Sequence, residues 1–251
     1  MDAIRPHLDL IYSYAAMFVA YLIGSLSFAV IVSKLMRLPD PRTYGSNNPG
    51  ATNVLRSGSK KAAALTLLLD ALKGYVPTAL VSYYAADFGL VDATIAFVGV
   101  AAFLGHLYPV FFKFKGGKGV ATALGVLLAY EPMLGVATLI VWVLVAAMFR
   151  YSSLAAIIAS VFAPFFTLMF FDRPVVALAV TIMSLMLIWR HWRNIMNLVA
   201  GKESKLGAKP DESGRGRRRH RRHRLHVEAP DTRAPGAQAS SSSSSSSSKG
   251  N

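Results

Sequence analysis

Residues 133–149 read MLGVATLIVWVLVAAMF, an apolar run without a charged side chain. A helix that crosses the hydrocarbon core of a bilayer needs roughly 20 mostly apolar residues, and fewer where neighbouring helices bury its ends. The pair Glu131-Pro132 gives a turn signal before the run, and Arg150 follows it. The run therefore predicts a membrane-spanning helix, and similar runs recur on both sides of it.

Six further segments share this apolar character. The seven expected spans are Leu10–Ser33, Ala62–Ala86, Ala93–Phe112, Val120–Tyr130, Met133–Phe149, Leu154–Phe171 and Val175–Ile188. Val120–Tyr130 is too short to cross comfortably alone, so a re-entrant segment is the alternative there. The sequence predicts an all-α membrane protein built as a bundle of about seven transmembrane helices.

The composition agrees with this class. Of 251 residues, 53% are hydrophobic and only 16% are charged, which is too apolar for a soluble domain of this length. The N-terminal MDAIRPHLDL lacks the features of a cleaved signal peptide, so the first span is expected to be retained. The chain has no cysteine, which excludes disulfides, thiolate nucleophiles and thiolate metal ligands.

The distribution of Lys and Arg predicts the orientation, because cytoplasmic loops near helix ends carry an excess of both. With seven spans, one side receives Lys34, Arg37, Arg42, Arg56, Lys60, Lys61, Lys113, Lys115, Lys118, Arg150, Arg190 and Arg193. The other side receives only Arg5 and Arg173. We therefore expect the N-terminus outside and the C-terminus inside.

The organisation expected along the chain is a membrane domain over residues 1–200 and a cytoplasmic tail over residues 201–251. The tail carries the basic stretch RGRRRHRRHR and an unbroken serine run at 240–248, with too few apolar residues to fold. Its basic residues are expected either to contact anionic lipid or simply to be solvated. Nucleic-acid binding is not expected, since no folded reading module accompanies them.

A glycine-rich segment on the basic side is the first candidate site. Residues 105–125 read GHLYPVFFKFKGGKGVATALG, in which Gly116, Gly117 and Gly119 surround Lys118 just before a helix. Such glycines let backbone N–H groups approach an anion, and the N-terminus of the following helix favours negative charge. The segment predicts a phosphate site, although its spacing does not fit a Walker A loop.

The first loop on the same side is the second candidate. Residues 43–56 read TYGSNNPGATNVLR, a density of turn-forming residues that a plain linker would not need. Ser46, Asn48, Thr52 and Asn53 can supply hydrogen bonds, and Arg56 can hold phosphate oxygens in a bidentate way. An ordinary tight turn is the alternative interpretation of this loop.

Two more clusters lie on the basic side, at residues 150–153 (RYSS) and 190–205 (RHWRNIMNLVAGKESK). His191 and Asn194 are three residues apart and so share a helix face, which is common at a helix end as well as in a site. Within the second span, Asp70 and Lys73 are also three apart. Unpaired charges are costly inside a membrane, so these two are expected to pair and to orient helices.

These segments resemble a known family, the PlsY-type acyl-phosphate:glycerol-3-phosphate acyltransferases of bacteria. The resemblance covers roughly residues 10–205 and depends on several strings in order. They are YLIGSLSFA at 21–29, the first loop, LDALKG at 69–74, the glycine-rich segment, RYSSL at 150–154 and the segment 190–205. Asn47 stands where many members have glycine, and the tail has no counterpart.

The sequence contains no metal-ligand cluster and no G-x-S-x-G elbow, so a cofactor-free, metal-free reaction is expected. The resemblance implies an enzyme of the bacterial inner membrane, with its site facing the cytoplasm. It would move an acyl group from acyl phosphate to the 1-hydroxyl of glycerol 3-phosphate, giving lysophosphatidate and phosphate. Its donor would come from an enzyme that produces acyl phosphate. The implied catalytic residues are Ser46, Arg56, Lys118, His191 and Asn194. The implied substrate- and phosphate-binding residues are Ser25, Asn48, Gly50, Thr52, Asn53, Gly116, Gly117, Gly119 and Ser153.

The general base stays open at this point between His191, His106 and an oxygen of a substrate phosphate. For His106, a buried helix-end side chain bonded to backbone is favoured over catalysis. A small membrane transporter for an anionic solute is the alternative function, because basic loops and an intramembrane ion pair would serve it equally well. The sequence contains no clear inverted repeat that would support it.

Overall fold

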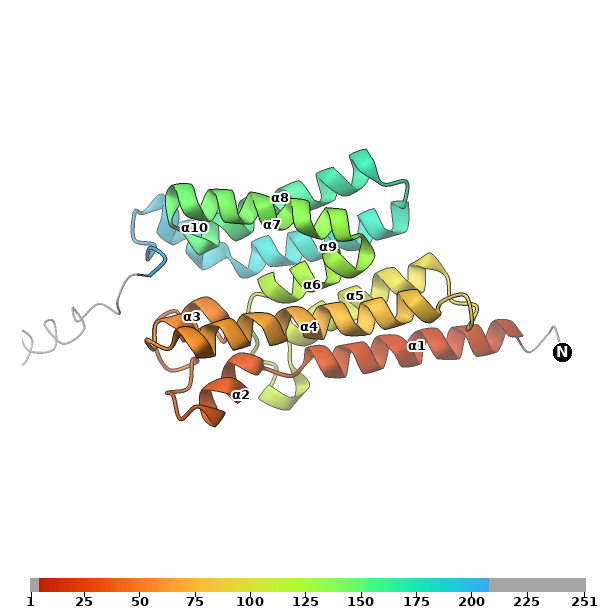
Figure 1. Ribbon diagram of the computed structural model, residues 1–251, viewed down its shortest axis with the longest axis horizontal. Coiled ribbons are helices and arrows are strands. Elements are labelled where there is room, and N and C mark those ends of the chain that lie inside the picture. The colour runs from red at the N-terminus through yellow and green to blue at the C-terminus, as the bar shows by residue number, and fades with distance from the viewer. Residues whose placement is uncertain (1–4, 208–251) are drawn as a thin grey trace, which may run out of the picture. The chain divides into compact units, whose positions relative to one another are not determined.

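The computed structural model describes residues 5–207, and within them ten α-helices and one short 3-10 helix are joined by loops (Figure 1). The helices are α1 (Arg5–Gly24), α2 (Phe28–Leu35), α3 (Ala51–Leu55), α4 (Lys60–Tyr84), α5 (Asp92–Leu107), η1 (Val110–Phe112), α6 (Val120–Tyr130), α7 (Pro132–Phe149), α8 (Ser152–Phe170), α9 (Pro174–Arg190) and α10 (Trp192–Val199). The expected tail beyond residue 207 lies outside the described residues.

The long helices form two groups joined by the short helix α6. Figure 1 shows α7, α8 and α9 together on one side and α1, α4 and α5 on the other, with α6 between them. Contacts agree with this view, since α6 packs against both α4 and α7, while α5 also packs against α9. The 11-residue α6 therefore lies inside the bundle, where its short length is no disadvantage.

The prediction of an all-helical membrane protein is confirmed. The structure gives four to six candidate spans, compared with about seven expected. Four helices are long and apolar enough to cross a membrane: α4, α5 continued through η1, α7 and α8. Two bent pairs, α1 with α2 and α9 with α10, raise the number to six if each pair counts as one span. Together with α6, these helices cover the seven segments expected from the sequence.

The first segment differs from the continuous helix expected over Leu10–Ser33. The chain leaves the helix after Gly24 and resumes at Phe28, with a bend of 41° between the two parts. The break frees the carbonyl of Leu26, which accepts a hydrogen bond from Nζ of Lys73 at 2.7 Å. The same Nζ lies 2.8 Å from Oδ1 of Asp70, so the predicted ion pair is confirmed.

Glycine brings α4 and α6 into backbone contact. A Cβ added at Gly125 of α6 would overlap the carbonyl of Ala71, and one at Gly74 of α4 would overlap the carbonyl of Thr122. Small residues let membrane helices approach this closely and gain packing contacts along their length. This contact fixes the helix that follows the glycine-rich segment.

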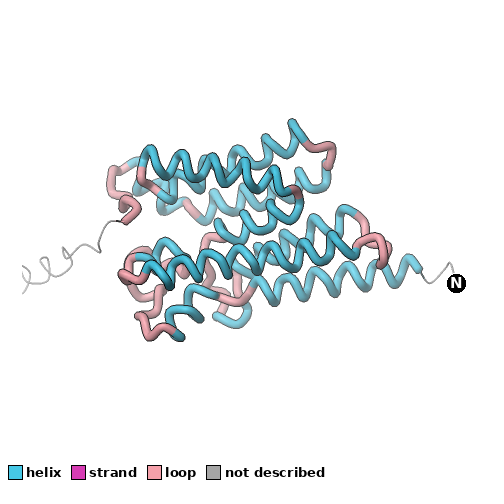
Figure 2. Tube along the Cα trace, viewed as in Figure 1, coloured by secondary structure: helices cyan, strands magenta, loops and turns pink. Residues whose placement is uncertain are grey.

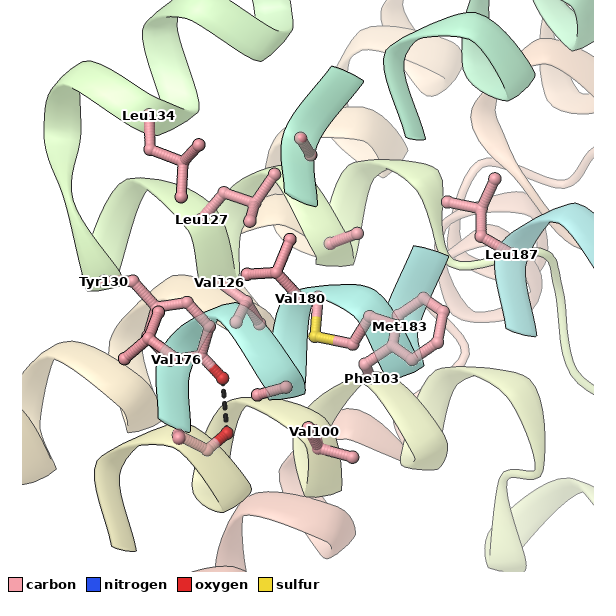
Figure 3. Close-up of a cluster of buried hydrophobic side chains, with 14 of the residues drawn as sticks. Val100, Phe103, Val126, Leu127, Tyr130, Leu134, Val176, Val180, Met183 and Leu187 are labelled. Atoms are coloured by element: carbon pink, nitrogen blue, oxygen red, sulfur yellow. Dashed lines mark hydrogen bonds between the residues drawn. The ribbon is translucent and has the colours of Figure 1, made fainter. Parts of the chain in front are cut away.

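The main apolar core lies between α5, α6, α7 and α9 (Figure 3). Phe103, Leu134 and Val180 are among its fully buried side chains. The hydroxyl of Tyr130 donates a hydrogen bond to the carbonyl of Ala96, which satisfies its polar group inside the core.

The two ends of the bundle are different. Figure 2 shows the longer loops gathered at the end that also carries α2, α3 and α10. At the other end, Arg173 donates to Asp92 at 3.1 Å and to the carbonyl of Tyr130 at 3.0 Å, and lies 3.4 Å from Glu131. The end with the long loops therefore holds the basic segments, and the opposite end is closed by short turns.

Candidate active site

A cavity of about 460 Å³ lies beneath the long loops and continues into the bundle. Its lining combines a polar group near the loops with apolar side chains of α4, α6, α7, α8 and α9. The polar group comes from four segments far apart in sequence, and it includes Ser46, Arg56, Lys118, Ser153, His191, Asn194 and Glu203. The cavity is the place where the candidate segments of the sequence meet.

Asn53 holds the first loop in shape. Its Nδ2 donates to the carbonyls of Pro41 at 2.6 Å and Tyr44 at 3.1 Å, and its Oδ1 accepts from the backbone N–H of Ser46 at 3.1 Å. The side chain is 2% exposed, and both its Nδ2 and its Oδ1 already form hydrogen bonds within the loop. Asn53 therefore orients Ser46, and its side chain offers little further capacity to a substrate.

The glycine-rich segment is held from two directions. The backbone N–H of Gly117 donates to the carbonyl of His106 at 3.2 Å. The guanidinium of Arg190 donates to the carbonyls of Gly116 and Gly117, each at 3.0 Å through Nη2. A Cβ at either glycine would overlap atoms of His106. The glycines are thus required by close packing, and Arg190 fixes the direction of their carbonyls.

Lys118 projects from this segment toward α10. Its Nζ donates to Oδ1 of Asn194 at 2.5 Å. Burial lowers the pKa of the lysine to about 8, the carboxylate of Glu203 opposes that shift, and the positive charges of Arg56 and Arg190 add to it. An anion bound beside Lys118 would favour its charged form and raise the pKa again.

Glu203 joins the polar group from beyond α10 and was not predicted from the sequence. Its Oε1 accepts hydrogen bonds from Oγ of Ser153 and from Nδ2 of Asn194, each at 2.7 Å. The backbone N–H of Leu206 donates to the carbonyl of Arg150 at 2.6 Å and fastens this stretch to the start of α8. Glu203 and Leu206 therefore contact the bundle although they lie beyond residue 200, the boundary expected for the membrane domain.

His191 lies at the bend between α9 and α10 and is 2% exposed. Its Nδ1 is 2.8 Å from the carbonyl of Leu187. Because a carbonyl oxygen only accepts, Nδ1 carries the hydrogen, and Nε2 of the neutral ring is left as an acceptor. The ring lines the cavity, so this nitrogen is a candidate to receive a proton.

His106 and the ion pair of α4 form a second buried layer. Nδ1 of His106 lies 3.0 Å from Oγ1 of Thr122 and 3.7 Å from Oδ1 of Asp70. The ring partner is therefore a hydroxyl, whereas a backbone partner was expected. Both His106 and Asp70 line the cavity, while Lys73 turns toward Leu26.

Most of the predicted site residues are brought together by the fold. Those that line the cavity are Ser46, Asn48, Gly50, Thr52, Asn53, Arg56, Lys118, Gly119, Ser153, His191 and Asn194. Gly116 and Gly117 lie behind Lys118, against His106. Ser25 is apart from the cavity lining, because its Oγ donates to the carbonyl of Tyr21 at the end of α1. The expected contact of Ser25 with a substrate is not supported by this position.

This arrangement suits an anion that carries a long apolar group. Lys118, Arg56 and the hydroxyls of Ser46 and Ser153 provide charge and hydrogen bonds at one end of the cavity, and aliphatic side chains line the other. Charge-assisted bonds of this kind are the usual means of holding phosphate. The cavity can therefore hold a phosphate group beside an acyl chain.

Comparisons with known proteins point in the same direction. A family model described as glycerol-3-phosphate acyltransferase matches residues 14–201. A protein of that name from Paraburkholderia phymatum is 62% identical over 191 residues, covering 76% of this chain and 91% of the relative. Another from Herminiimonas arsenicoxydans is 60% identical over 190 residues, covering 76% and 93%.

Two crystal structures of PlsY, an integral membrane glycerol 3-phosphate acyltransferase, are also similar to this chain. The lysophosphatidic acid form has a TM-score of 0.72 and 38% sequence identity. The glycerol 3-phosphate form has a TM-score of 0.73 and 39% identity. Each comparison covers 78% of this chain and 96% of the other.

Proposed function

Because the chain belongs to the glycerol-3-phosphate acyltransferase family, it is an enzyme that acylates glycerol 3-phosphate to lysophosphatidic acid, and we propose that acyl phosphate is its donor. A donor of this class must come from an enzyme that produces acyl phosphate. The observation that supports the proposal best is the cavity itself, in which a cationic end adjoins an apolar end inside the bundle. Acyl phosphate has the same two parts.

In the proposed reaction, the 1-hydroxyl oxygen of glycerol 3-phosphate attacks the carbonyl carbon of acyl phosphate. The carbon–oxygen bond to phosphate then breaks, and the leaving phosphate takes the electron pair. Because the mixed anhydride has a good leaving group, the protein need only orient the hydroxyl and stabilise the developing charge. No metal or cofactor is needed for such a step.

The assigned roles follow from the positions of the side chains. Lys118 and Arg56 carry the charge that holds phosphate, and Ser46 and Ser153 add hydrogen bonds. Asn194 orients a substrate or its carbonyl, and it is itself held by Lys118 and Glu203.

The hydroxyl proton goes either to Nε2 of His191 or to a phosphate oxygen of the substrate. The free acceptor nitrogen of His191 supports the first route. His106 is the less favourable base, because its Nδ1 faces Thr122 and its Nε2 lies against Gly117.

We propose further that the site faces the cytoplasm of a bacterial inner membrane, with the N-terminus outside and the C-terminus inside. Seven membrane segments, including the short α6, would give this arrangement. The gathering of the basic loops at one end of the bundle supports it, because basic residues accumulate on the cytoplasmic side. The opposite end carries Arg173, which is already engaged by Asp92 and Glu131.

The test is an assay of the purified protein with acyl phosphate and glycerol 3-phosphate, with lysophosphatidic acid as the readout. Lys118→Ala and Arg56→Ala are each expected to lower the rate by at least about 100-fold, since each removes a charge that acts on phosphate. Lys115→Ala is the matched control, because Lys115 is an exposed lysine of the same loop that does not line the cavity. Near-normal turnover in both site variants would refute the assignment.

A further inference from the structure

The cavity ends at a similar distance from the loop end of α4, α7 and α8. On α8 the lining residues run from Ser152 to Ala163, and on α4 from Lys60 to Asp70. On α7 the deepest is Thr138, eleven residues from the end at Phe149. At a rise of about 1.5 Å per residue, the deepest lining residue of each of these three helices lies roughly 15 Å from its loop end. This depth is about half of the roughly 30 Å hydrocarbon core of a bilayer.

A rigid layer closes the cavity at that depth. Leu127 and Val180 line its lower part, and Tyr130, Leu134 and Val176 pack directly behind them (Figure 3). All five side chains are buried. The hydroxyl bond of Tyr130 to the backbone of α5 fixes this layer, which gives the cavity a floor.

One face of α8 keeps the cavity wide. Ala156, Ala159 and Ala163 all line it and are all buried, at spacings of three and four residues that place them on one face of the helix. The opposite face of α8 carries large exposed side chains such as Val161 and Phe165. Bulk on α8 is therefore directed outward, and the inner face carries only small side chains, the three alanines and Ser160.

We propose that Ala159 and Ala163, together with the floor at Val180, set the longest acyl chain that the enzyme accepts. The inference rests on the proposed acyl phosphate donor, whose phosphate would be held near Lys118 with its chain directed toward the floor. A chain that is too long must then bend back or leave its carbonyl out of place. One methylene more or less in such a pocket changes kcat/KM by roughly 10-fold or more.

The test measures kcat/KM for decanoyl, lauroyl, palmitoyl and stearoyl phosphate at saturating glycerol 3-phosphate. Ala163→Phe is expected to lower kcat/KM for palmitoyl and stearoyl phosphate at least about 10-fold relative to decanoyl phosphate. Ala159→Phe lies one turn nearer the phosphate end, so its loss should extend to lauroyl phosphate. The KM for glycerol 3-phosphate should stay as in the unmodified enzyme in both variants.

Val161→Phe is the matched control, because it adds similar bulk to the same helix on the exposed face, and its length profile should be unchanged. Val180→Ala lowers the floor and is expected to raise the relative kcat/KM for stearoyl phosphate, a gain that damage to the fold cannot produce. An unchanged length profile in Ala163→Phe, Ala159→Phe and Val180→Ala would overturn the inference. Absence of product from every acyl phosphate in the unmodified enzyme would instead refute the proposed donor.

Discussion

At the scale of single residues, Lys118 is the clearest example of a group shaped by its surroundings. Burial favours its neutral form and lowers its pKa to about 8, while Glu203 favours its charged form. A phosphate dianion bound beside Nζ would act in the same direction as Glu203. At neutral pH Lys118 is therefore mostly charged, and a bound anion would stabilise that charge further by raising the pKa.

This gives a prediction for pH. As pH rises through about 8, Lys118 of the free enzyme loses its proton, so kcat/KM for glycerol 3-phosphate should fall about 10-fold per pH unit above that value. The substrate phosphate is already a dianion there, since its second pKa is near 6. A rate profile between pH of about 6 and about 10 measures the fall. A profile that stays flat to the alkaline end would contradict the role given to Lys118.

Arg190 provides a second prediction at this scale. Its guanidinium spans the carbonyls of Gly116 and Gly117, and a lysine has no rigid pair of donors to do so. Arg190→Lys should raise KM for glycerol 3-phosphate about 10- to 100-fold, as expected for lost hydrogen bonds to a charged group. Steady-state kinetics of the variant measures the change.

A pH profile separates this positioning role from general damage. Arg190→Gln removes a charge that lowers the pKa of Lys118, so the alkaline fall in kcat/KM should move to higher pH. Arg190→Lys keeps the charge and should leave that fall in place. Arg193→Gln, at an exposed arginine one turn away, is the control. A fall that stays at the same pH in Arg190→Gln would argue against the assignment.

At the scale of elements, the contact between α4 and α6 carries the glycine-rich segment. Helix propensity alone would let Gly125→Ala raise the free energy of unfolding by up to about 1 kcal/mol. The added methyl group would instead meet the carbonyl of Ala71, so we expect a net destabilisation of about 1–3 kcal/mol. Thermal unfolding in detergent measures it. A variant that is more stable than the original protein would show that the helices are not held this closely.

The sequence predicted the long helices well, because an apolar run of sufficient length has few alternatives in a membrane protein. It did not predict the break after Gly24, since Gly, Ser and Leu at this point continue the apolar pattern. It also missed α3, which is five residues long and lies in a polar segment, whereas the helical spacing of His191 and Asn194 had indicated a helix where α10 lies. Length and apolarity are informative only for elements that cross the bilayer.

The candidate site was predicted in part for a similar reason. Lys118 and Arg56 lie in local patterns of glycine and turn residues, which a sequence displays directly. Arg190 and Glu203 act through partners 74 and 50 residues away, at Gly116 and Ser153, and no local pattern reveals such contacts. Chain folding rather than local sequence decides which polar residues become neighbours.

At the scale of the whole described bundle, the two ends differ in structure and in their proposed role. One end gathers the basic loops over the cavity, and the other is closed by Arg173 with its acidic partners. Between them, the cavity reaches about half of the bilayer core and stops at the layer around Tyr130. The substrates would therefore meet within one leaflet, with phosphate at the loops and the acyl chain along the helices.

The absence of cysteine makes a direct test of this arrangement simple. Single cysteines at Ser46, Ser153 and Lys115 would be labelled with a membrane-impermeant thiol reagent in vesicles of known orientation. We predict that all three react from the cytoplasmic side, and that glycerol 3-phosphate protects the cavity positions Ser46 and Ser153 but leaves Lys115 reactive. Labelling of Ser46 and Ser153 from opposite sides of the membrane, or reaction rates unaffected by the substrate, would contradict a shared cationic site.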